Sequence, residues 1–249
     1  MQTILILGAT SSIAQACMHV WAKQKQVSKF ICVARNKEKL KNFCEDFVIR
    51  YPQVEIEQDI LNFSAVNEIK DQIDRYFDQQ VIDQALVVQG MMYQDEMELS
   101  VSDIEALIHL NTISVAVAVD CLYKRMSMQN KGEIGVIGSV AGDRGRKANY
   151  LYGASKSFVA TYLEGLQHRI ALDKSIVTVS LIKPGPTESN MTKHLTVEGK
   201  KLAKTDVVAA QIVNGMHNGK RVIYAPTLWK VIMLIIRHLP FFIFKKIDV

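Results

Sequence analysis

Residues 3–14 read Thr3-Ile4-Leu5-Ile6-Leu7-Gly8-Ala9-Thr10-Ser11-Ser12-Ile13-Ala14, an apolar run, then a glycine, then small and hydroxyl side chains. A helical pattern of apolar residues continues through Trp21. An apolar strand, a glycine turn and a helix N-terminus form a cradle for a nucleotide pyrophosphate, because backbone N–H groups and the helix dipole face the phosphates. The sequence therefore predicts a nucleotide-binding unit in which Ser12 and Ala14 stand at two further glycine positions.

Similar apolar runs recur along the chain and alternate with helical patterns. They lie near residues 3–7, 30–34, 54–56, 84–88, 134–138, 176–182 and 222–225. This alternation is typical of a parallel sheet covered by helices on both faces, with ligands at the carboxyl ends of the strands. We expect one Rossmann-like, doubly wound α/β domain of about seven parallel strands over residues 1–225, followed by an apolar and basic tail over residues 226–249.

A second signal lies in Tyr152-Gly153-Ala154-Ser155-Lys156, which follows Ser139 by thirteen residues. Residues four apart share a helix face, so the Tyr152 phenol and the Lys156 ammonium are expected to project into one place. A nearby ammonium favours the phenolate and lowers the pKa of a tyrosine from about 10. Ser139, at the end of an apolar run, is placed to hold a substrate oxygen. These residues predict an acid catalyst; the alternative is a core-edge tyrosine with a solvated lysine.

Together, the glycine turn and the residues Ser139, Tyr152 and Lys156 resemble the short-chain dehydrogenase/reductase family, and the resemblance covers nearly all of the chain. It implies a catalytic tetrad of Asn111, Ser139, Tyr152 and Lys156, in which Asn111 anchors a proton-relay water. It also implies hydride transfer between a nicotinamide cofactor and a carbonyl carbon.

The resemblance further implies the nucleotide contacts. Asp59 matches an acid that hydrogen-bonds the adenine, the Pro184-Gly185 turn lies beside the nicotinamide, and Ser189 stands at a threonine position. Val88-Gln89-Gly90 replaces the usual Asn-x-Ala-Gly, which alters the support of the central strand. The expected cofactor contacts are Gly8, Thr10, Ser11, Ser12, Ile13, Arg35, Asp59, Ile60, Gln89, Gly90, Tyr152, Lys156, Pro184, Gly185, Thr187 and Ser189.

The choice of cofactor depends on the second apolar run, which ends at Ala34 and continues into Arg35. An acidic residue at this place would bind the ribose 2′-hydroxyl of NAD. Arg35 can instead meet a 2′-phosphate through a planar, charge-assisted contact, and Ser11 can add a hydroxyl. We therefore expect NADPH to be favoured over NADH; the alternative is a solvated Arg35.

Cysteine and histidine spacing gives no sign of a metal site. The four cysteines, Cys17, Cys32, Cys44 and Cys121, lack C-x-x-C spacing, and the six histidines lack ligand spacing. The cysteines are interpreted as small hydrophobic residues in a reducing, cytoplasmic compartment, and no metal is expected.

Positive charge is concentrated near the C-terminus. The last thirty residues contain six lysines and arginines and one acidic residue, Asp248, so their net charge is +5. This value equals the formal net charge of the whole chain, +5. Residues 1–219 are therefore balanced, which argues against nucleic-acid binding.

The tail segment Trp229–Phe244 combines two apolar runs with Arg237-His238 between them. It is too short and too interrupted to span a membrane. Apolar and aromatic residues flanked by cations are typical of an anchor on anionic lipid, so we expect peripheral contact with the inner face of the membrane. The alternative is a subunit interface, a use of the C-terminus that the family resemblance implies, and a homo-oligomer is expected.

The segment Gly142–Tyr152, joined to this tail, resembles the reductases that complete the epimerisation of decaprenylphosphoryl ribose. Those enzymes reduce a 2-keto sugar on a polyprenyl phosphate. The resemblance implies that Arg144, Arg146 and Lys147 lie near the site as partners for a phosphate. Two alternatives stay open: a soluble ketoreductase of an acyl or small-carbonyl substrate, and a non-catalytic NADP-binding interaction protein.

Overall fold

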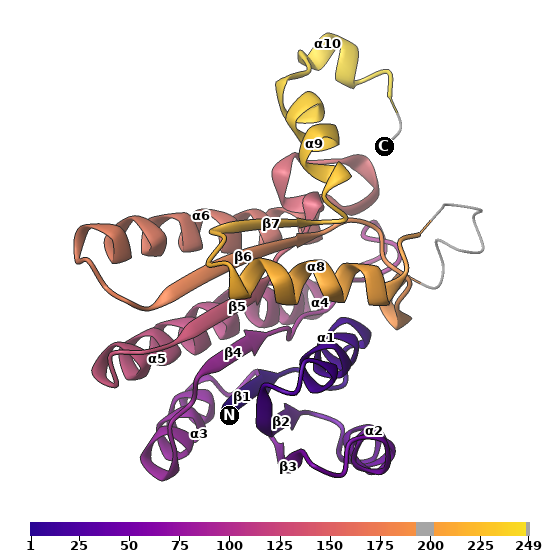
Figure 1. Cartoon of the computed structure of the whole chain (residues 1–249). Helices are drawn as coiled ribbons and strands as arrows, with labels where there is room; N and C mark the ends of the chain where they lie inside the picture. Colours follow the sequence, from indigo (N-terminus) through magenta and orange to yellow (C-terminus); the bar gives the residue numbers. More distant parts are fainter. Residues whose placement is uncertain (193–201, 248–249) are drawn as a thin grey trace.

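The computed structural model describes residues 1–192 and 202–247, and its centre is a parallel sheet in the order β3-β2-β1-β4-β5-β6-β7 (Figure 1). The strands are β1 (Gln2–Leu7), β2 (Val27–Ala34), β3 (Glu55–Ile60), β4 (Gln84–Val87), β5 (Glu133–Ile137), β6 (Thr178–Pro184) and β7 (Val222–Ala225). Neighbouring strands all pair in parallel. The expected fold of seven parallel strands is confirmed. The strand order reverses between β1 and β4, and ligands of such sheets bind at the carboxyl ends beside that point.

Helices cover both faces of the sheet, and β1 shows why. Ile4 and Ile6 belong to one buried cluster, whereas Leu5 and Leu7 belong to the other, because successive side chains of a strand point to opposite faces. One face is covered by α1 (Ser12–Lys23), α2 (Lys37–Arg50) and α8 (Thr205–His217), and the other by α3 (Val66–Gln79), α5 (Ser114–Met128) and α6 (Tyr150–Leu172). A strand buried on both faces has no place for polar side chains, so it reads as a continuous apolar run.

Strand β3 differs from its expected range, because the apolar pattern indicated residues 54–56 and the strand continues to Ile60. It lies at the edge of the sheet. Lys29 of β2 forms ion pairs with Glu55 at 3.0 Å and with Glu57 at 2.8 Å. Ion pairs between β2 and the edge strand β3 take the place of apolar cross-strand contacts. An apolar pattern therefore predicts only the first residues of β3.

A long helical stretch, Val101–Met128, is apolar enough to span a membrane by length and composition. It consists of α4 (Val101–Ile108), the π-helical turn η1 (His109–Ile113) and α5. Core packing explains its composition, since Leu107 and Val119 are fully buried. The π-turn carries Asn111, and such turns are frequent at functional sites.

Beyond β7 the chain forms α9 (Leu228–His238) and α10 (Phe241–Phe244), which project from the rest of the molecule (Figure 1). α9 packs against β7 and against the 3-10 turn η2 (Val140–Asp143). Met233 and Ile236 form a small buried cluster with Val140. The segment is thus attached by one face of α9.

Candidate active site

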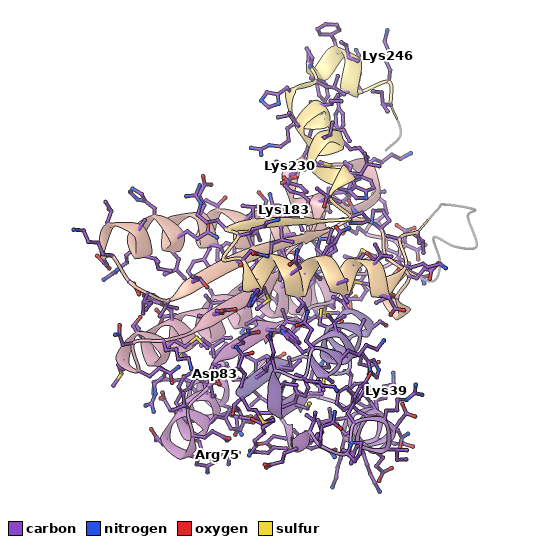
Figure 2. All side chains as sticks on the ribbon, in the orientation of Figure 1. Lys39, Arg75, Asp83, Lys183, Lys230 and Lys246 are labelled. Atoms are coloured by element: carbon purple, nitrogen blue, oxygen red, sulfur yellow. The ribbon has the colours of Figure 1, made fainter. Side chains whose placement is uncertain are left out.

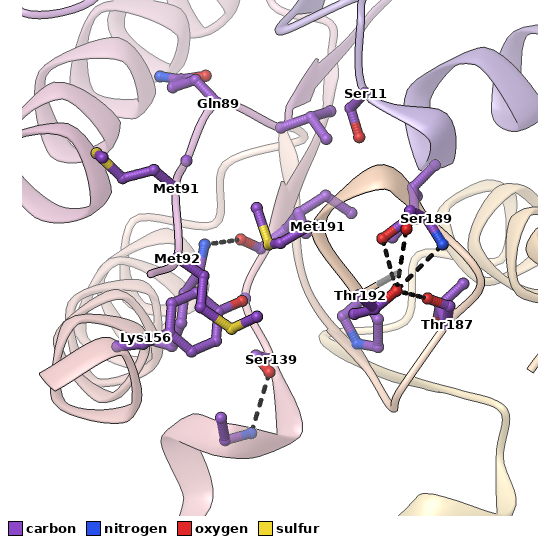
Figure 3. Close-up of a pocket in the computed structure, with 18 of the residues that line it drawn as sticks. Ser11, Gln89, Met91, Met92, Ser139, Lys156, Thr187, Ser189, Met191 and Thr192 are labelled. Atoms are coloured by element: carbon purple, nitrogen blue, oxygen red, sulfur yellow. Dashed lines mark hydrogen bonds between the residues drawn. The ribbon is translucent and has the colours of Figure 1, made fainter. Parts of the chain in front are cut away.

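A cavity of about 440 Å³ lies at the carboxyl ends of the strands. Its wall includes the segments that follow β1, β2, β4, β5 and β6, together with the first turns of α6. Figure 3 shows this arrangement, with Ser11 and Gln89 in one part of the cavity and Ser139 in another. Most of the expected site residues are brought together here: Gly8, Thr10, Ser11, Ser12, Ile13, Arg35, Gln89, Gly90, Ser139, Tyr152, Lys156, Pro184, Gly185, Thr187 and Ser189 line the cavity.

Tyr152 lies in the first turn of α6, and a carboxylate from a distant part of the sequence caps that turn. Glu96, which is only 7% exposed, accepts hydrogen bonds from the backbone N–H of Leu151 at 2.7 Å and of Tyr152 at 2.8 Å. A carboxylate at a helix N-terminus satisfies the free N–H groups and complements the helix dipole. No sequence pattern marked Glu96, because it lies in a loop more than fifty residues before the helix.

Burial, and not the neighbouring lysine, dominates the pKa of Tyr152. Desolvation raises this pKa to about 12, while the Ser139 hydroxyl and the charge of Arg146 act in the lowering direction. The Lys156 ammonium donates to the carbonyl of Ile137 at 3.0 Å and lies 5.7 Å from the centroid of the Tyr152 ring. Desolvation also lowers the pKa of Lys156 to about 8. The expectation that Lys156 lowers the pKa of Tyr152 is therefore wrong for the cofactor-free protein.

Asn111 is fully buried and does not line the cavity. Its side-chain oxygen accepts from the backbone N–H of Met91 at 2.8 Å, and its amide donates to the Met91 carbonyl at 2.9 Å and to the Ser155 hydroxyl at 3.0 Å. Asn111 thus ties the segment after β4 to α6. A Cβ placed on Gly90 would lie 3.2 Å from this oxygen and 3.4 Å from the Lys156 nitrogen, so Asn111, Gly90 and Lys156 are neighbours.

The glycine turn after β1 is shaped for a close approach. Gly8 has a φ of 98°, and a Cβ there would lie 2.8 Å from the backbone nitrogen of Gln89, so only glycine fits. Ser11 precedes α1 in an extended conformation, and its side chain makes no capping hydrogen bond. Its hydroxyl is therefore available to a ligand. Arg35 forms no ion pair within the described residues.

Gln89 adds an observation that fits a nucleotide. Its side chain is 5% exposed, it lines the cavity, and neither its oxygen nor its nitrogen has a partner within the described chain. Buried amides without partners are costly, so a polar ligand group beside Gln89 would satisfy it. Gly8, Ser11 and Gln89 together fit a dinucleotide.

Asp59 and Ile60 lie outside the cavity, unlike the other expected cofactor contacts. The Asp59 carboxylate accepts from Arg75 at 2.6 Å, from the Tyr76 hydroxyl at 3.0 Å and from the Gln72 amide. Its second oxygen accepts from the backbone N–H of Ile60 at 2.8 Å. β3 places the Asp59 carboxylate among the polar side chains of α3. The adenine contact expected for Asp59 stays a prediction.

The three cations of the 144–147 segment are not equivalent, which corrects the expectation that all of them stand near the site. Arg144 donates to the carbonyls of Ile236 at 2.5 Å and Leu239 at 2.6 Å, and its guanidinium lies 3.9 Å from the centroid of the Phe244 ring. Lys147 is exposed and does not line the cavity. Only Arg146 lines it, where burial lowers the pKa of the guanidinium.

The tail contacts the cavity wall through Trp229. A Cβ on Gly185 would collide with the indole of Trp229, so this tryptophan covers the Pro184-Gly185 turn of the cavity wall. The methionines Met91, Met92 and Met191 complete the apolar part of the wall (Figure 3). The sequence alone does not mark these methionines as cavity-lining residues, because a methionine in the core would show the same pattern.

Comparisons with known proteins agree with this geometry. Residues 2–199 match the model of the short chain dehydrogenase family. An uncharacterized oxidoreductase of Mycobacterium tuberculosis is 28% identical over 153 residues, which cover 61% of this chain and 60% of that protein. An uncharacterized oxidoreductase of Staphylococcus aureus is 26% identical over 83% of this chain and 87% of that protein. The chain therefore aligns with less than two thirds of the mycobacterial relative.

Two solved structures share the fold. A short-chain dehydrogenase from Sphingobium yanoikuyae in complex with NADPH superposes with a TM-score of 0.77 at 20% identity, covering 93% of this chain and 92% of that one. A short chain dehydrogenase/reductase from Burkholderia phymatum in complex with NAD gives a TM-score of 0.83 at 18% identity, covering 94% and 92%. Structures of this fold thus include complexes with either dinucleotide.

Proposed function

The chain belongs to the short-chain dehydrogenase family, and on that premise we propose that it is a reductase that transfers a hydride from a nicotinamide cofactor to a ketone. The observation that carries the proposal is the meeting of Ser139, Tyr152 and Lys156 with the Gly8 turn in one cavity. Hydride transfer to a carbonyl uses both a phosphate cradle for the cofactor and a proton donor for the carbonyl oxygen. Nucleotide binding alone would use only the cradle.

Each residue has a role that its position supports. Tyr152, whose phenol burial keeps protonated, gives a proton to the carbonyl oxygen, and Ser139 orients that oxygen. A reduced nicotinamide, when bound, supplies the hydride. Lys156 binds the nicotinamide ribose and offsets charge on the phenolate that Tyr152 leaves behind. Asn111 holds the Met91 backbone and Ser155 in register with these groups, and as a further proposal it anchors a proton-relay water.

We propose that NADPH is the preferred cofactor. Arg35 lines the cavity after β2, where no acidic residue stands to take a ribose hydroxyl. Its planar guanidinium suits a 2′-phosphate, and Ser11 offers a free hydroxyl nearby.

The finer proposal is a lipid-linked substrate, a keto-sugar on a polyprenyl phosphate, reached at the inner face of a membrane. It is supported by the tail, in which one face packs on the protein while Leu234, Ile235, Phe241 and Phe242 are each about 60–70% exposed. The same segment carries the cations Lys230, Arg237, Lys245 and Lys246, and Figure 2 labels Lys230 and Lys246 near its two ends. Exposed apolar side chains on a segment that also carries cations suit an anionic lipid surface.

The decisive experiment follows NADPH oxidation with a polyprenyl-phosphate 2-keto-sugar in mixed micelles and with soluble ketones of similar size. Turnover of the lipid-linked ketone alone supports the finer proposal. Turnover of soluble acyl or small ketones alone supports the soluble ketoreductase. NADPH binding without turnover of either group would leave a nucleotide-binding interaction protein.

A further inference from the structure

Four buried, unpartnered polar atoms belong to described side chains that line the cavity, and two of them lie on one short segment. Besides the Gln89 amide, these atoms are the Nε of Arg146 and the Oδ1 of Asn149. Arg146 immediately precedes the 3-10 turn η3 (Lys147–Asn149) and Asn149 is its last residue. A hydrogen bond from the Asn149 N–H to the Arg146 carbonyl at 3.3 Å closes the turn. The turn therefore presents a cation and an amide to the same space.

The carboxylates that contact this part of the chain are committed to other groups. Asp143 pairs with the buried Lys183 ammonium and accepts from the Tyr224 hydroxyl at 2.8 Å. Glu96 accepts from the first N–H groups of α6. Within residues 1–192 and 202–247, Arg146 forms no ion pair with a carboxylate, although the charge of Asp143 acts to raise its pKa. A guanidinium stays charged in proteins, and a partly buried charge without a partner is costly.

Arg146 and Tyr152 line the same cavity, and each acts on the pKa of the other. From this geometry we propose that Arg146 and Asn149 form an anion subsite beside Tyr152, and that the substrate carries a carboxylate or phosphate group near its carbonyl. This inference rests on the proposed function in one respect, namely that the substrate carbonyl binds beside Tyr152. Met92 and Met191 provide an adaptable apolar wall for the rest of the substrate.

The test measures ligand binding to the protein saturated with NADP⁺, because a ketone cannot be reduced by the oxidised cofactor and the cofactor's own phosphate sites are filled. The probes are two matched pairs: 4-oxopentanoate with its methyl ester, and dihydroxyacetone phosphate with dihydroxyacetone. We expect the anion of at least one pair to bind about tenfold more tightly than its neutral partner, the size of a charge-assisted hydrogen bond. The pair with the larger preference tells a carboxylate from a phosphate.

Arg146→Met should remove the preference for the anion, and Asn149→Leu should reduce it. Lys147→Met is the matched control, because it removes a cation from the same turn outside the cavity and should keep the preference. Arg146→Gln replaces Arg146→Met where the latter does not fold. Equal affinities within both pairs, including no detectable binding of either anion, or a preference that survives loss of Arg146, would overturn the subsite. An anion preference that depends on Arg146 in a protein that reduces no ketone would leave the subsite standing and refute the reductase.

Discussion

The strand-end site and the C-terminal tail are held in different ways. Tyr152 and Lys156 donate hydrogen bonds to Glu96 and to the Ile137 carbonyl, and Asn111 accepts one from the N–H of Met91, so three other parts of the chain hold these residues. The tail is held by the packed face of α9 and by the Arg144 contacts, and it leaves large apolar side chains exposed. The described chain supplies hydrogen-bond partners for these three site residues, whereas it leaves the apolar side chains of the tail uncovered.

The sharpest test of the strand-end site is Tyr152→Phe. Without the phenolic proton, kcat for ketone reduction should fall by roughly 10²–10⁴-fold, the usual contribution of a general acid. NADPH affinity should stay near that of the unmodified protein, since the hydroxyl acts mainly in the transition state. Stopped-flow NADPH oxidation and fluorescence titration measure the two quantities. Near-normal turnover by this variant would show that the proton comes from another group.

The nucleotide end of the same site is tested by exchanging cofactor preference. Ala34→Asp with Arg35→Ala removes a cationic partner of the 2′-phosphate and adds a repelling carboxylate. We expect kcat/KM to favour NADPH over NADH by about 10–100-fold in the unmodified protein and to favour NADH in the double variant. Lys37→Ala, a neighbouring cation that does not line the cavity, should leave the ratio unchanged. Equal kcat/KM values for both cofactors before mutation would refute the role of Arg35.

Burial of Lys156 predicts a pH dependence of stability. Its folded pKa of about 8 lies below the ordinary 10.5, so between these values the unfolded chain binds more protons and stability rises with pH. The contribution of Lys156 alone to this rise should amount to about 2 kcal/mol between pH 8 and 10 in the cofactor-free protein. Burial raises the pKa of the Cys17 and Cys121 thiols, which acts in the opposite direction above pH 9, so the Lys156 contribution is read from the difference between two proteins. Above pH 10 the raised pKa of Tyr152 acts in the opposite direction, because the unfolded tyrosine ionises first. Urea unfolding of the unmodified protein and of Lys156→Met should differ by this rise; parallel pH profiles would contradict it.

A substitution at Glu96 tests how the positioning of Tyr152 affects kcat, because it leaves the reacting side chains unchanged. Glu96→Gln removes the charge and leaves one oxygen for two N–H donors, which should lower the free energy of unfolding by about 2 kcal/mol. The start of α6 should loosen, so kcat should fall more than the affinity for NADPH. Glu98→Gln, an exposed neighbour, serves as the control. A normal kcat with reduced stability would limit Glu96 to a structural role.

The smallest expected effects concern the tail. Lys245→Gln should weaken binding to vesicles rich in phosphatidylglycerol about fivefold, since a cation near an anionic surface contributes about 1 kcal/mol. Lys39→Gln, on the distant helix α2 (Figure 2), should have no effect. Phe241→Ser should weaken binding further by removing an exposed aromatic ring. If the protein ignores vesicles and Phe241→Ser instead dissociates an oligomer, the tail is a subunit interface.

The fold and most of the strand-end site followed from local sequence. Short apolar runs predicted the seven strands, because strands buried on both faces admit few polar residues. Gly8, Ser139 and Pro184 lie just after or at the ends of such runs, and the ends of parallel strands meet at one edge of the sheet. Their assembly into one cavity was therefore predictable from chain position alone.

Only the tertiary structure decided what each charged side chain faces. Arg144 and Arg146 are two residues apart, yet Arg144 binds carbonyls more than ninety residues further along the chain and Arg146 lines the cavity. The elevated pKa of Tyr152 likewise depends on burial, whereas Lys156, four residues away, is not among the groups that shift it. Sequence patterns report neighbours along a helix or strand, whereas desolvation and long-range hydrogen bonds depend on how those elements pack.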